Sequence, residues 1–358
     1  MRKQKTLAAR LLWVFKLLVL AVTLSYIYVE LIRTGRYKEL YEMLLHTGWF
    51  EAWLILLTLL LMVANWSLES RKWQLLMRHI SRISFGRAMR AVFSGVTIST
   101  WMPNRIGEYI GRVFYLPPKA RIKAIFSTIA GSLCQMAVTL IAGTIGLFMA
   151  WQNKSSFITN VAGSDSPVVI IIILGALVVV SLLYLLALFN IGMAVRLVPV
   201  SIKWKKLRQG LAILTRYDRK LMLSVLGISA LRYVVFAMQF YLLLLVFQIN
   251  VAMFPALALI AVIFLVQSVV PSIALSELGI RGAASIAILQ VLTANTAGIF
   301  SASYSLWLVN IILPSLFGAV FILRARYRKE GTQRKLRKTA QQEVSITASE
   351  RPASLSSK

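Results

Sequence analysis

Two short stretches, far apart in a chain of 358 residues, carry the same charged chemistry inside apolar surroundings. Glu108 and Arg112 follow a proline in the first stretch, and Glu277 and Arg281 follow one in the second. In each pair the side chains are four residues apart, so on a helix they face the same side. Ionisable groups at membrane depth are costly and usually face a cavity or a partner. Because the chain has only 12 acidic residues, we interpret the repeated pair as part of a functional site.

Helix-breaking and small residues flank both pairs. Pro103 ends the incoming segment of the first stretch, and the helix that follows can direct free N–H groups towards an anion. Gly107 and Gly111 form a Gly-x-x-x-Gly face, which lets another backbone approach closely. The residues that we expect to support the site are Pro103, Asn104, Gly107, Gly111, Pro271 and Gly279.

Positive charge exceeds negative charge among the groups predicted to lie inside the membrane. The predicted substrate-binding residues are Arg105, Glu108, Arg112, Arg232, Glu277 and Arg281. This surplus suits a phosphate, which Arg binds in bidentate fashion. We expect the two charged turns to meet near mid-membrane. Two alternatives stay open. Each Glu–Arg pair is a purely structural ion pair, and Arg232 either extends its charged end to the membrane surface or is structurally paired.

The composition predicts an all-α polytopic membrane protein. Hydrophobic residues make up 58% of the chain, against roughly half in soluble proteins, and the mean hydropathy is +0.75. A helix needs about 20 apolar residues to cross a bilayer. The longest apolar runs are Leu11–Val29, Glu51–Leu68, Ala124–Trp151, Val168–Asn190, Leu221–Phe247, Pro255–Leu275 and Ser305–Leu323. The first of them is too long for a cleavable signal peptide, so we expect it to stay as an anchor.

The formal net charge of +28 follows from short basic segments beside the apolar runs. These segments are Met1–Arg10, Arg71–Arg90, Lys119–Lys123, Arg196–Lys220 and Arg324–Lys338. Cytoplasmic loops of membrane proteins carry such an excess of Lys and Arg, which also attracts anionic lipid. We therefore expect a lipid bilayer and no nucleic acid as the partner. The predicted location is the plasma membrane, the inner membrane in a bacterium, with both termini cytoplasmic.

Charge placement also predicts two hairpins. If Ala91–Leu116 crossed the membrane once, the basic segments after it would lie outside; if it enters and returns, all of them stay inside. Pro255–Thr293 must likewise enter and return, from the opposite face. The predicted fold has about six full spans plus two re-entrant or hairpin elements in an inverted-topology repeat. We place the membrane domain at 1–323, its repeats at about 51–151 and 221–323, and a basic, disordered cytosolic tail at 324–358. The run Pro255–Leu275 is either re-entrant or a full span.

Four residues follow the second apolar run. We interpret Glu69, Arg71, Lys72 and Trp73 as the point where this helix reaches the lipid headgroups. The single cysteine, Cys134, and the two histidines, His46 and His79, do not suggest a metal site. The sequence also has no metalloprotease, phosphate-binding-loop or serine-hydrolase motif. We expect neither a cofactor nor an enzymatic activity.

The charged motifs resemble a known family. Glu69-x-Arg-Lys-Trp73, then Pro103-Asn-Arg-Ile-Gly-Glu-Tyr109, then Leu278-Gly-Ile-Arg-Gly282 follow the order found in the lysylphosphatidylglycerol synthetase transmembrane family, the flippase-like integral membrane proteins. The resemblance implies a polytopic plasma-membrane protein that moves an aminoacylated phospholipid between leaflets. In that family a separate cytosolic domain makes the lipid, and we expect that domain to be missing here. The second motif departs from the usual Gly-Gly-x-Gly-x-x-Glu, because Glu277 precedes Arg281.

Two classes of function remain after these exclusions. The first is a flippase for a lipid with a phosphate-containing headgroup: a phospholipid, an aminoacylated phospholipid or a polyprenyl-phosphate conjugate. The alternative is a non-transporting scaffold or regulator of an envelope-lipid enzyme. Candidate partners are the membrane lipid as substrate, that enzyme, and a second copy of the chain in a homo-oligomer. A membrane-embedded transferase would need Glu108 as a base, but no nucleophile or metal motif supports it.

Overall fold

A computed structural model describes residues 48–100, 102, 106–153, 167–193, 205–269 and 274–324. In the segments 167–193, 205–269 and 274–324, the side chains are described only from residues 168, 208 and 279 onwards, respectively. Throughout the described part the regular elements are helices, which confirms the predicted all-α fold. The predicted anchor Leu11–Val29 and residues 325–358 of the predicted tail lie outside the described residues.

Five helices of the described part are long and apolar enough to span a membrane. They are α3 (Trp49–Met77), α6 (Pro118–Gln152), α8 (Pro167–Phe189), α11 (Arg219–Val246) and the last span, Thr296–Arg324. The last span consists of α14 (Thr296–Trp307), the π-helix η3 (Leu308–Ile312) and a further helical segment up to Arg324. Side-chain caps set two of their starts. Asp218 Oδ1 accepts a hydrogen bond from Leu221 N at 3.1 Å, and Asn295 Oδ1 accepts one from Gly298 N at 2.8 Å. The cap at Asn295 starts the last span well before the predicted run Ser305–Leu323.

Shorter helices form the two predicted hairpins. They are α4 (Phe85–Ser99) with α5 (Gly107–Val113), and α12 (Met253–Val269) with α13 (Ala274–Leu289). Helix α12 has 17 residues, a length of about 26 Å, and α13 packs against it. The structure thus shows a short helix with a second one packed on it, and the choice between a re-entrant element and a full span at Pro255–Leu275 stays a prediction. Helix α4 begins at Phe85 rather than at the predicted Ala91, because its first turn is amphipathic: Arg87 is exposed and Ala88 is buried.

The same order of elements occurs twice: a long helix, two short ones and a second long helix. The offset in residue number that carries Glu108 onto Glu277 also carries Arg112 onto Arg281, and the end of α3 onto the end of α11. Helices α3 and α11 pack antiparallel, since Thr58 contacts Gln239 while Asn65 contacts Arg232. An antiparallel contact between corresponding helices is the geometry expected of an inverted repeat. The repeat and tail boundaries given above stay predictions.

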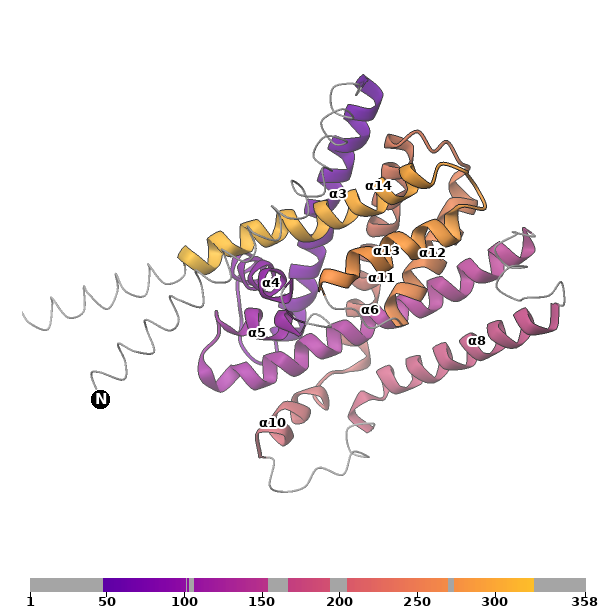
Figure 1. Ribbon diagram of the computed structural model, residues 1–358. Coiled ribbons are helices and arrows are strands. Elements are labelled where there is room, and N and C mark those ends of the chain that lie inside the picture. Colours follow the sequence, from indigo (N-terminus) through magenta and orange to yellow (C-terminus); the bar gives the residue numbers. More distant parts are fainter. Residues whose placement is uncertain are drawn as a thin grey trace, which may run out of the picture.

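Each hairpin lies against the closing span of the other repeat (Figure 1). On α6, Gly143 and Gly146 face α12, and a Cβ atom on Gly146 would overlap the carbonyl of Ala258. On the last span, a Cβ atom on Gly318 would overlap the carbonyl of Phe93 in α4. Thr97 Oγ1 of α4 also donates a 2.8 Å hydrogen bond to Ser315 O. Glycine thus allows both close backbone contacts.

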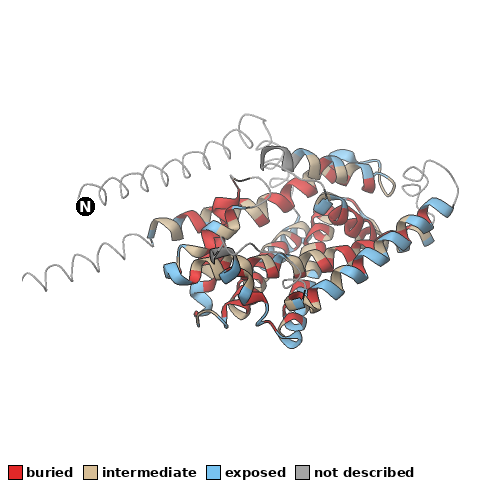
Figure 2. Ribbon diagram, turned by 90° about the horizontal axis from the view of Figure 1, so that it is seen from below, coloured by how far each residue is buried: buried red, intermediate tan, exposed pale blue. Residues whose placement is uncertain are grey.

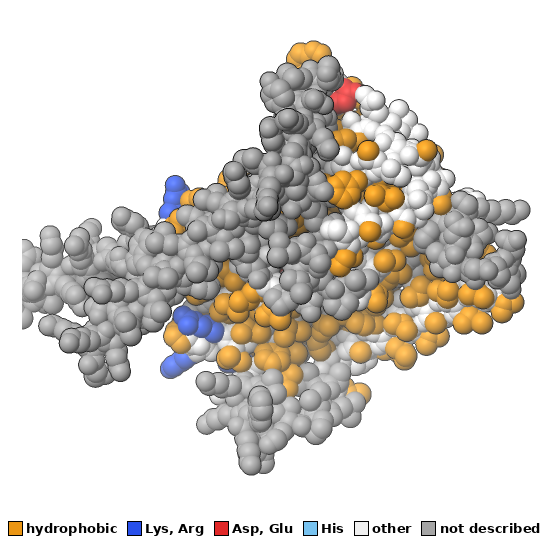
Figure 3. All heavy atoms as spheres, in the orientation of Figure 1, with side chains coloured by type: hydrophobic (Ala, Val, Ile, Leu, Met, Phe, Trp, Pro, Cys, Tyr) orange, Lys and Arg blue, Asp and Glu red, His pale blue; other side chains and the backbone are white. Residues whose placement is uncertain are grey.

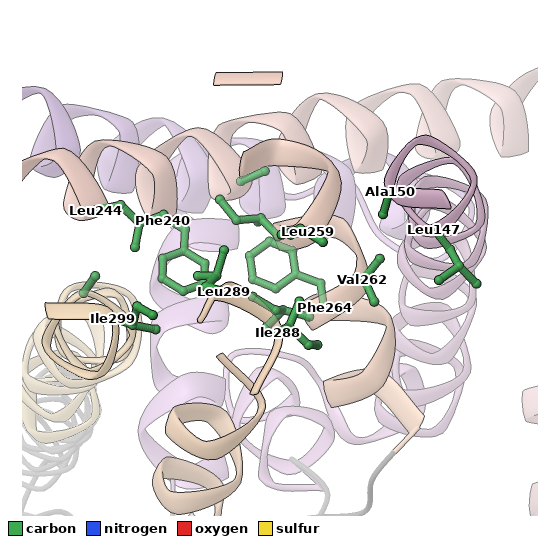
Figure 4. Close-up of a cluster of buried hydrophobic side chains, with 14 of the residues drawn as sticks. Leu147, Ala150, Phe240, Leu244, Leu259, Val262, Phe264, Ile288, Leu289 and Ile299 are labelled. Carbon is green, nitrogen blue, oxygen red and sulfur yellow. The ribbon is translucent and has the colours of Figure 1, made fainter. Parts of the chain in front are cut away.

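The largest apolar core surrounds the second hairpin (Figure 4). Phe264 of α12 packs against Phe240 of α11, and the centroids of these two rings lie 6.1 Å apart. Helix α8 lies outside α6 and exposes much of its apolar surface, with Ile172 63% and Leu183 61% exposed (Figures 1 and 2). Figure 3 shows a broad apolar surface in the region of α6 and α8. In a bilayer such a surface faces lipid.

Candidate functional site

A buried carboxylate, Glu69 of α3, holds the charged groups of three helices together. Its Oε1 accepts a hydrogen bond from Arg112 Nη2 of α5 at 2.8 Å. Its Oε2 lies 2.6 Å from Arg232 Nη1 of α11 and 2.7 Å from Lys72 Nζ of its own helix. Glu69 is only 4% exposed. One carboxylate therefore neutralises part of the charge of three cations away from water.

A second carboxylate completes this group, which we call the Glu69 cluster: Glu69, Lys72, Glu108, Arg112 and Arg232. Glu108 Oε2 lies 3.0 Å from Arg112 Nη2, one helical turn away on α5. The side chains of Glu108 and Arg232 are each 18% exposed, against 3% for Lys72 and Arg112. Glu108 and Arg232 thus form the accessible rim. Three cations and two carboxylates leave one unit of positive charge.

Amide side chains extend the cluster towards the last span. Arg232 Nε donates to Asn65 Oδ1 at 2.9 Å, and Asn65 Nδ2 donates to Asn310 Oδ1 at 3.1 Å. Asn310 lies in η3, and single turns of π-helix are frequent at functional sites. The Arg232 guanidinium also lies 5.4 Å from the ring centroid of Trp66, a cation–π contact. A continuous polar path therefore runs from the last span to the first hairpin.

One donor of the cluster stays unused. Arg112 Nε is buried and has no hydrogen-bond partner within the described part of the protein. A buried N–H without a partner costs free energy, so such a group calls for an explanation. The Glu69 and Glu108 carboxylates both contact Arg112 through Nη2 and leave Nε free for another acceptor.

Glycine places α5 close enough for these contacts. A Cβ atom on Gly107 would overlap the backbone of Ile98, and one on Gly111 would meet the backbone of Ser94 and Gly95. Both glycines are buried against α4, so the hairpin is packed backbone to backbone. The short α5 consequently presents Arg112 directly to Glu69.

The hydroxyl group of one tyrosine connects α3, α6 and the segment that precedes α11. Tyr217, in the connection between α10 (Lys205–Leu214) and α11, donates to Leu76 O of α3 at 3.1 Å. Its hydroxyl also lies 2.6 Å from Ser127 Oγ of α6. Burial raises the pKa of Tyr217 to about 12, so the hydroxyl stays protonated and keeps its donor at neutral pH.

The structure brings three of the six predicted substrate-binding residues together: Glu108, Arg112 and Arg232. Arg281 lies half-buried on α13, where its carbonyl accepts a 2.7 Å hydrogen bond from Ser285 Oγ, and Gly279 is exposed on the same helix. Pro103, Asn104, Arg105 and Pro271 lie outside the described residues, as does the side chain of Glu277. A shared site between the two charged turns stays a prediction.

Of the four residues interpreted as a headgroup boundary, Glu69, Lys72 and Trp73 are not on the surface of the described structure. All three are buried between helices, and Trp73 Nε1 donates to Thr128 Oγ1 at 3.1 Å. Their neighbour Arg71 is the exposed residue of this turn. The spacing of Asn65, Glu69 and Lys72 contains the signal that the interpretation missed, because it places all three on one helical face. Asn310 gave no comparable signal.

Acidic, histidine and cysteine side chains do not gather into a group of three or more that could hold a metal within the described residues. The chemistry present is that of Arg and Lys donors facing carboxylates in a largely buried cluster. Such an arrangement can hold an oxyanion through charge-assisted hydrogen bonds.

Fold and site together define a polytopic α-helical membrane protein with a charge cluster enclosed between its spans. The family model described as Lysylphosphatidylglycerol synthase TM region matches residues 13–318. The chain belongs to this family, which confirms the resemblance of its motifs. No curated protein matches it.

Proposed function

We propose that the protein is a transporter that moves a lipid with a phosphate-containing headgroup between the leaflets of the plasma membrane. The lipid is a phospholipid, an aminoacylated phospholipid or a polyprenyl-phosphate conjugate. The observation that carries this proposal is the surplus of positive charge in the Glu69 cluster, within helices whose outer surfaces are apolar. Charged groups in a membrane interior usually mark the path of a substrate.

In this proposal the headgroup enters from the rim formed by Glu108 and Arg232. Its phosphate then binds the Arg and Lys donors, while its acyl chains stay in the bilayer along the apolar outer surface of the helices. No covalent bond is made or broken, so the protein acts as a carrier rather than an enzyme. The inverted hairpins supply the two-sided geometry with which such proteins expose a central site alternately to each face.

One observation favours the alternative, a scaffold or regulator of an envelope-lipid enzyme. Both oxygens of Glu69 are already paired, and such a network can hold helices together without any ligand. A scaffold would act through a partner protein, either the enzyme or a second copy of the chain. It would also keep its function when the cluster is altered without loss of folding.

Transport by the purified full-length protein in proteoliposomes distinguishes the two. Vesicles with a fluorescent phosphatidylglycerol in both leaflets are treated with an impermeant quencher, and the rate at which inner-leaflet lipid becomes accessible is measured. We expect Arg112→Ala and Arg281→Ala each to reduce this rate by roughly tenfold or more, the effect of losing about 1.4 kcal/mol of binding. The control is Arg208→Ala, on the exposed face of α10, which should transport normally.

Equal losses in all three variants would indicate general destabilisation rather than a site. A wild-type protein that inserts and folds but moves no lipid would contradict the transporter and leave the scaffold.

A further inference from the structure

The Glu69 carboxylate is paired with Lys72, Arg112 and Arg232, the same cationic donors that would bind a lipid phosphate in the proposed function. We propose that Glu69 is an internal anion that competes with the headgroup for Lys72, Arg112 and Arg232, and that sets the charge of the site to suit a phosphodiester with one negative charge. This inference rests on the proposed function and names the residue that determines its charge specificity.

The geometry of the carboxylate resembles that of the ligand it would compete with. Three cationic donors converge on its two oxygens at 2.6, 2.7 and 2.8 Å. A phosphate presents oxygen acceptors to the same kinds of donor, and Arg can bind it through two nitrogens, whereas Arg112 and Arg232 each reach Glu69 through one. The unused Nε of Arg112 offers one more hydrogen bond to an anion larger than a carboxylate.

The charge balance points to a single negative charge. The three cations and two carboxylates of the Glu69 cluster leave one positive charge, which a phosphodiester neutralises. A phosphomonoester carries about two negative charges above its second pKa of about 6, so it would leave the buried site negative. Because an uncompensated charge away from water is costly, the site should prefer the diester.

The inverted repeat indicates that packing alone does not require this carboxylate. The offset that carries Glu108 onto Glu277 carries Glu69 onto Met238 of α11, and it carries Arg232 back onto Val63 of α3. The corresponding position of the second repeat is therefore filled by an apolar side chain, which is partly buried. At the position that matches Glu69, the second repeat thus has no carboxylate, as expected of a binding group rather than of a repeated structural contact.

Competition also explains how a site with three cations could release its ligand. Transport needs binding that is favourable enough for entry and weak enough for exit. An internal anion that takes back the donors as the phosphate leaves lowers the cost of exit, because the cations do not remain unpaired.

The test measures binding rather than transport. The detergent-purified full chain is titrated by calorimetry at pH 8 with dihexanoyl-phosphatidylglycerol, a diester, and with dihexanoyl-phosphatidic acid, a monoester. We expect Glu69→Gln to bind both probes more tightly, the monoester by roughly tenfold more than the diester, because the site gains one positive charge. Glu69→Asp, which keeps the charge, should preserve the wild-type ratio of the two affinities.

Glu51→Gln is the matched control, since it removes a carboxylate from the first turn of the same helix without touching the Glu69 cluster. It should leave both affinities unchanged. If Glu69→Gln does not fold, Glu108→Gln replaces it: this change also adds one positive charge, and it should shift the ratio in the same direction. An unchanged or reversed ratio in the folded variant overturns the inference.

The two proposals fail separately. Transport with an unchanged ratio in Glu69→Gln would retain the transporter and remove the role of Glu69. The expected shift in binding without any transport would retain the role of Glu69 and remove the transporter.

Discussion

At the residue scale, the Glu69 carboxylate is a point at which one substitution affects three cations. Lys72, Arg112 and Arg232 are held near one another, and Glu69 is the carboxylate that contacts all three. Removing one partner of a buried ion pair leaves an uncompensated charge, which costs more than the pair contributes when intact.

The first prediction concerns stability. Glu69→Ala should lower the free energy of unfolding by about 3–5 kcal/mol, because Lys72, Arg112 and the partly buried Arg232 then lose the carboxylate that they share. Unfolding of the purified protein in detergent by denaturant, followed by circular dichroism, measures the change. The control is Arg71→Ala, two residues along the same helix. The exposed Arg71 guanidinium donates a hydrogen bond from Nη1 to Gln74 Oε1 at 2.7 Å. Its loss should cost no more than about 0.5 kcal/mol. Similar losses in both variants would contradict the central role of Glu69.

The second prediction concerns the amides next to the Glu69 cluster. Asn310→Leu should cost about 1–3 kcal/mol, because it leaves Asn65 Nδ2 buried without its acceptor. The double variant Asn65→Leu with Asn310→Leu should cost less than the sum of the single variants, since each change removes the same hydrogen bond. Denaturant unfolding of the four proteins measures this coupling. Strict additivity would show that the two amides do not interact.

At the element scale, glycines allow the close backbone contacts of the hairpins. Gly107 and Gly111 allow α5 to pack closely on α4, and Gly318 allows the last span to pack closely on α4. The sequence indicated both hairpins through the placement of basic segments. It misjudged where α4 and α14 begin, because the amphipathic first turn of α4 and the cap at Asn295 act locally and leave little trace in hydropathy.

The third prediction tests this packing. Gly318→Ala should lower the melting temperature in detergent, because its new methyl group would overlap the Phe93 carbonyl and separate the last span from α4. Gly227→Ala, on α11, is the control: a Cβ atom there has no atom within 4 Å in the described structure. Alanine should stabilise that exposed helical position by up to about 1 kcal/mol. A Gly318→Ala protein as stable as the wild type would show that the helices do not touch there.

At the scale of the whole molecule, the inverted arrangement depends on which loops lie inside the cell. The positive-inside rule places the connection after α6 outside and the region of α10 inside. The family and the apolar helices establish a multi-pass membrane protein, while its orientation is a prediction.

The fourth prediction therefore concerns topology. In whole cells, an impermeant maleimide should label Ser164→Cys directly, and should label Gln209→Cys only after permeabilisation. The native Cys134 is fully buried in α6, so the unmodified protein serves as the unlabelled control. Reversed accessibility would reverse the orientation and overturn the assignment of both hairpins to their membrane faces.

The class of fold and one half of the site could be predicted from local features of the amino-acid sequence. Long apolar runs must become helices in lipid, because every backbone N–H and C=O then finds a partner within its own segment. The four-residue spacing of Glu108 and Arg112 likewise placed both side chains on one face of a short helix. These are local properties, which depend on residues close together in the chain.

Which charged side chains contact one another could not be predicted, because it depends on how the helices pack. Glu69 contacts Arg112 from 43 residues away, and Arg232 reaches it across 163 residues. Helical periodicity shows that Asn65, Glu69 and Lys72 share a face, but not which helix covers that face. That choice follows from the antiparallel packing of α3 on α11 and from the close approach of α5, and both depend on contacts between distant parts of the chain.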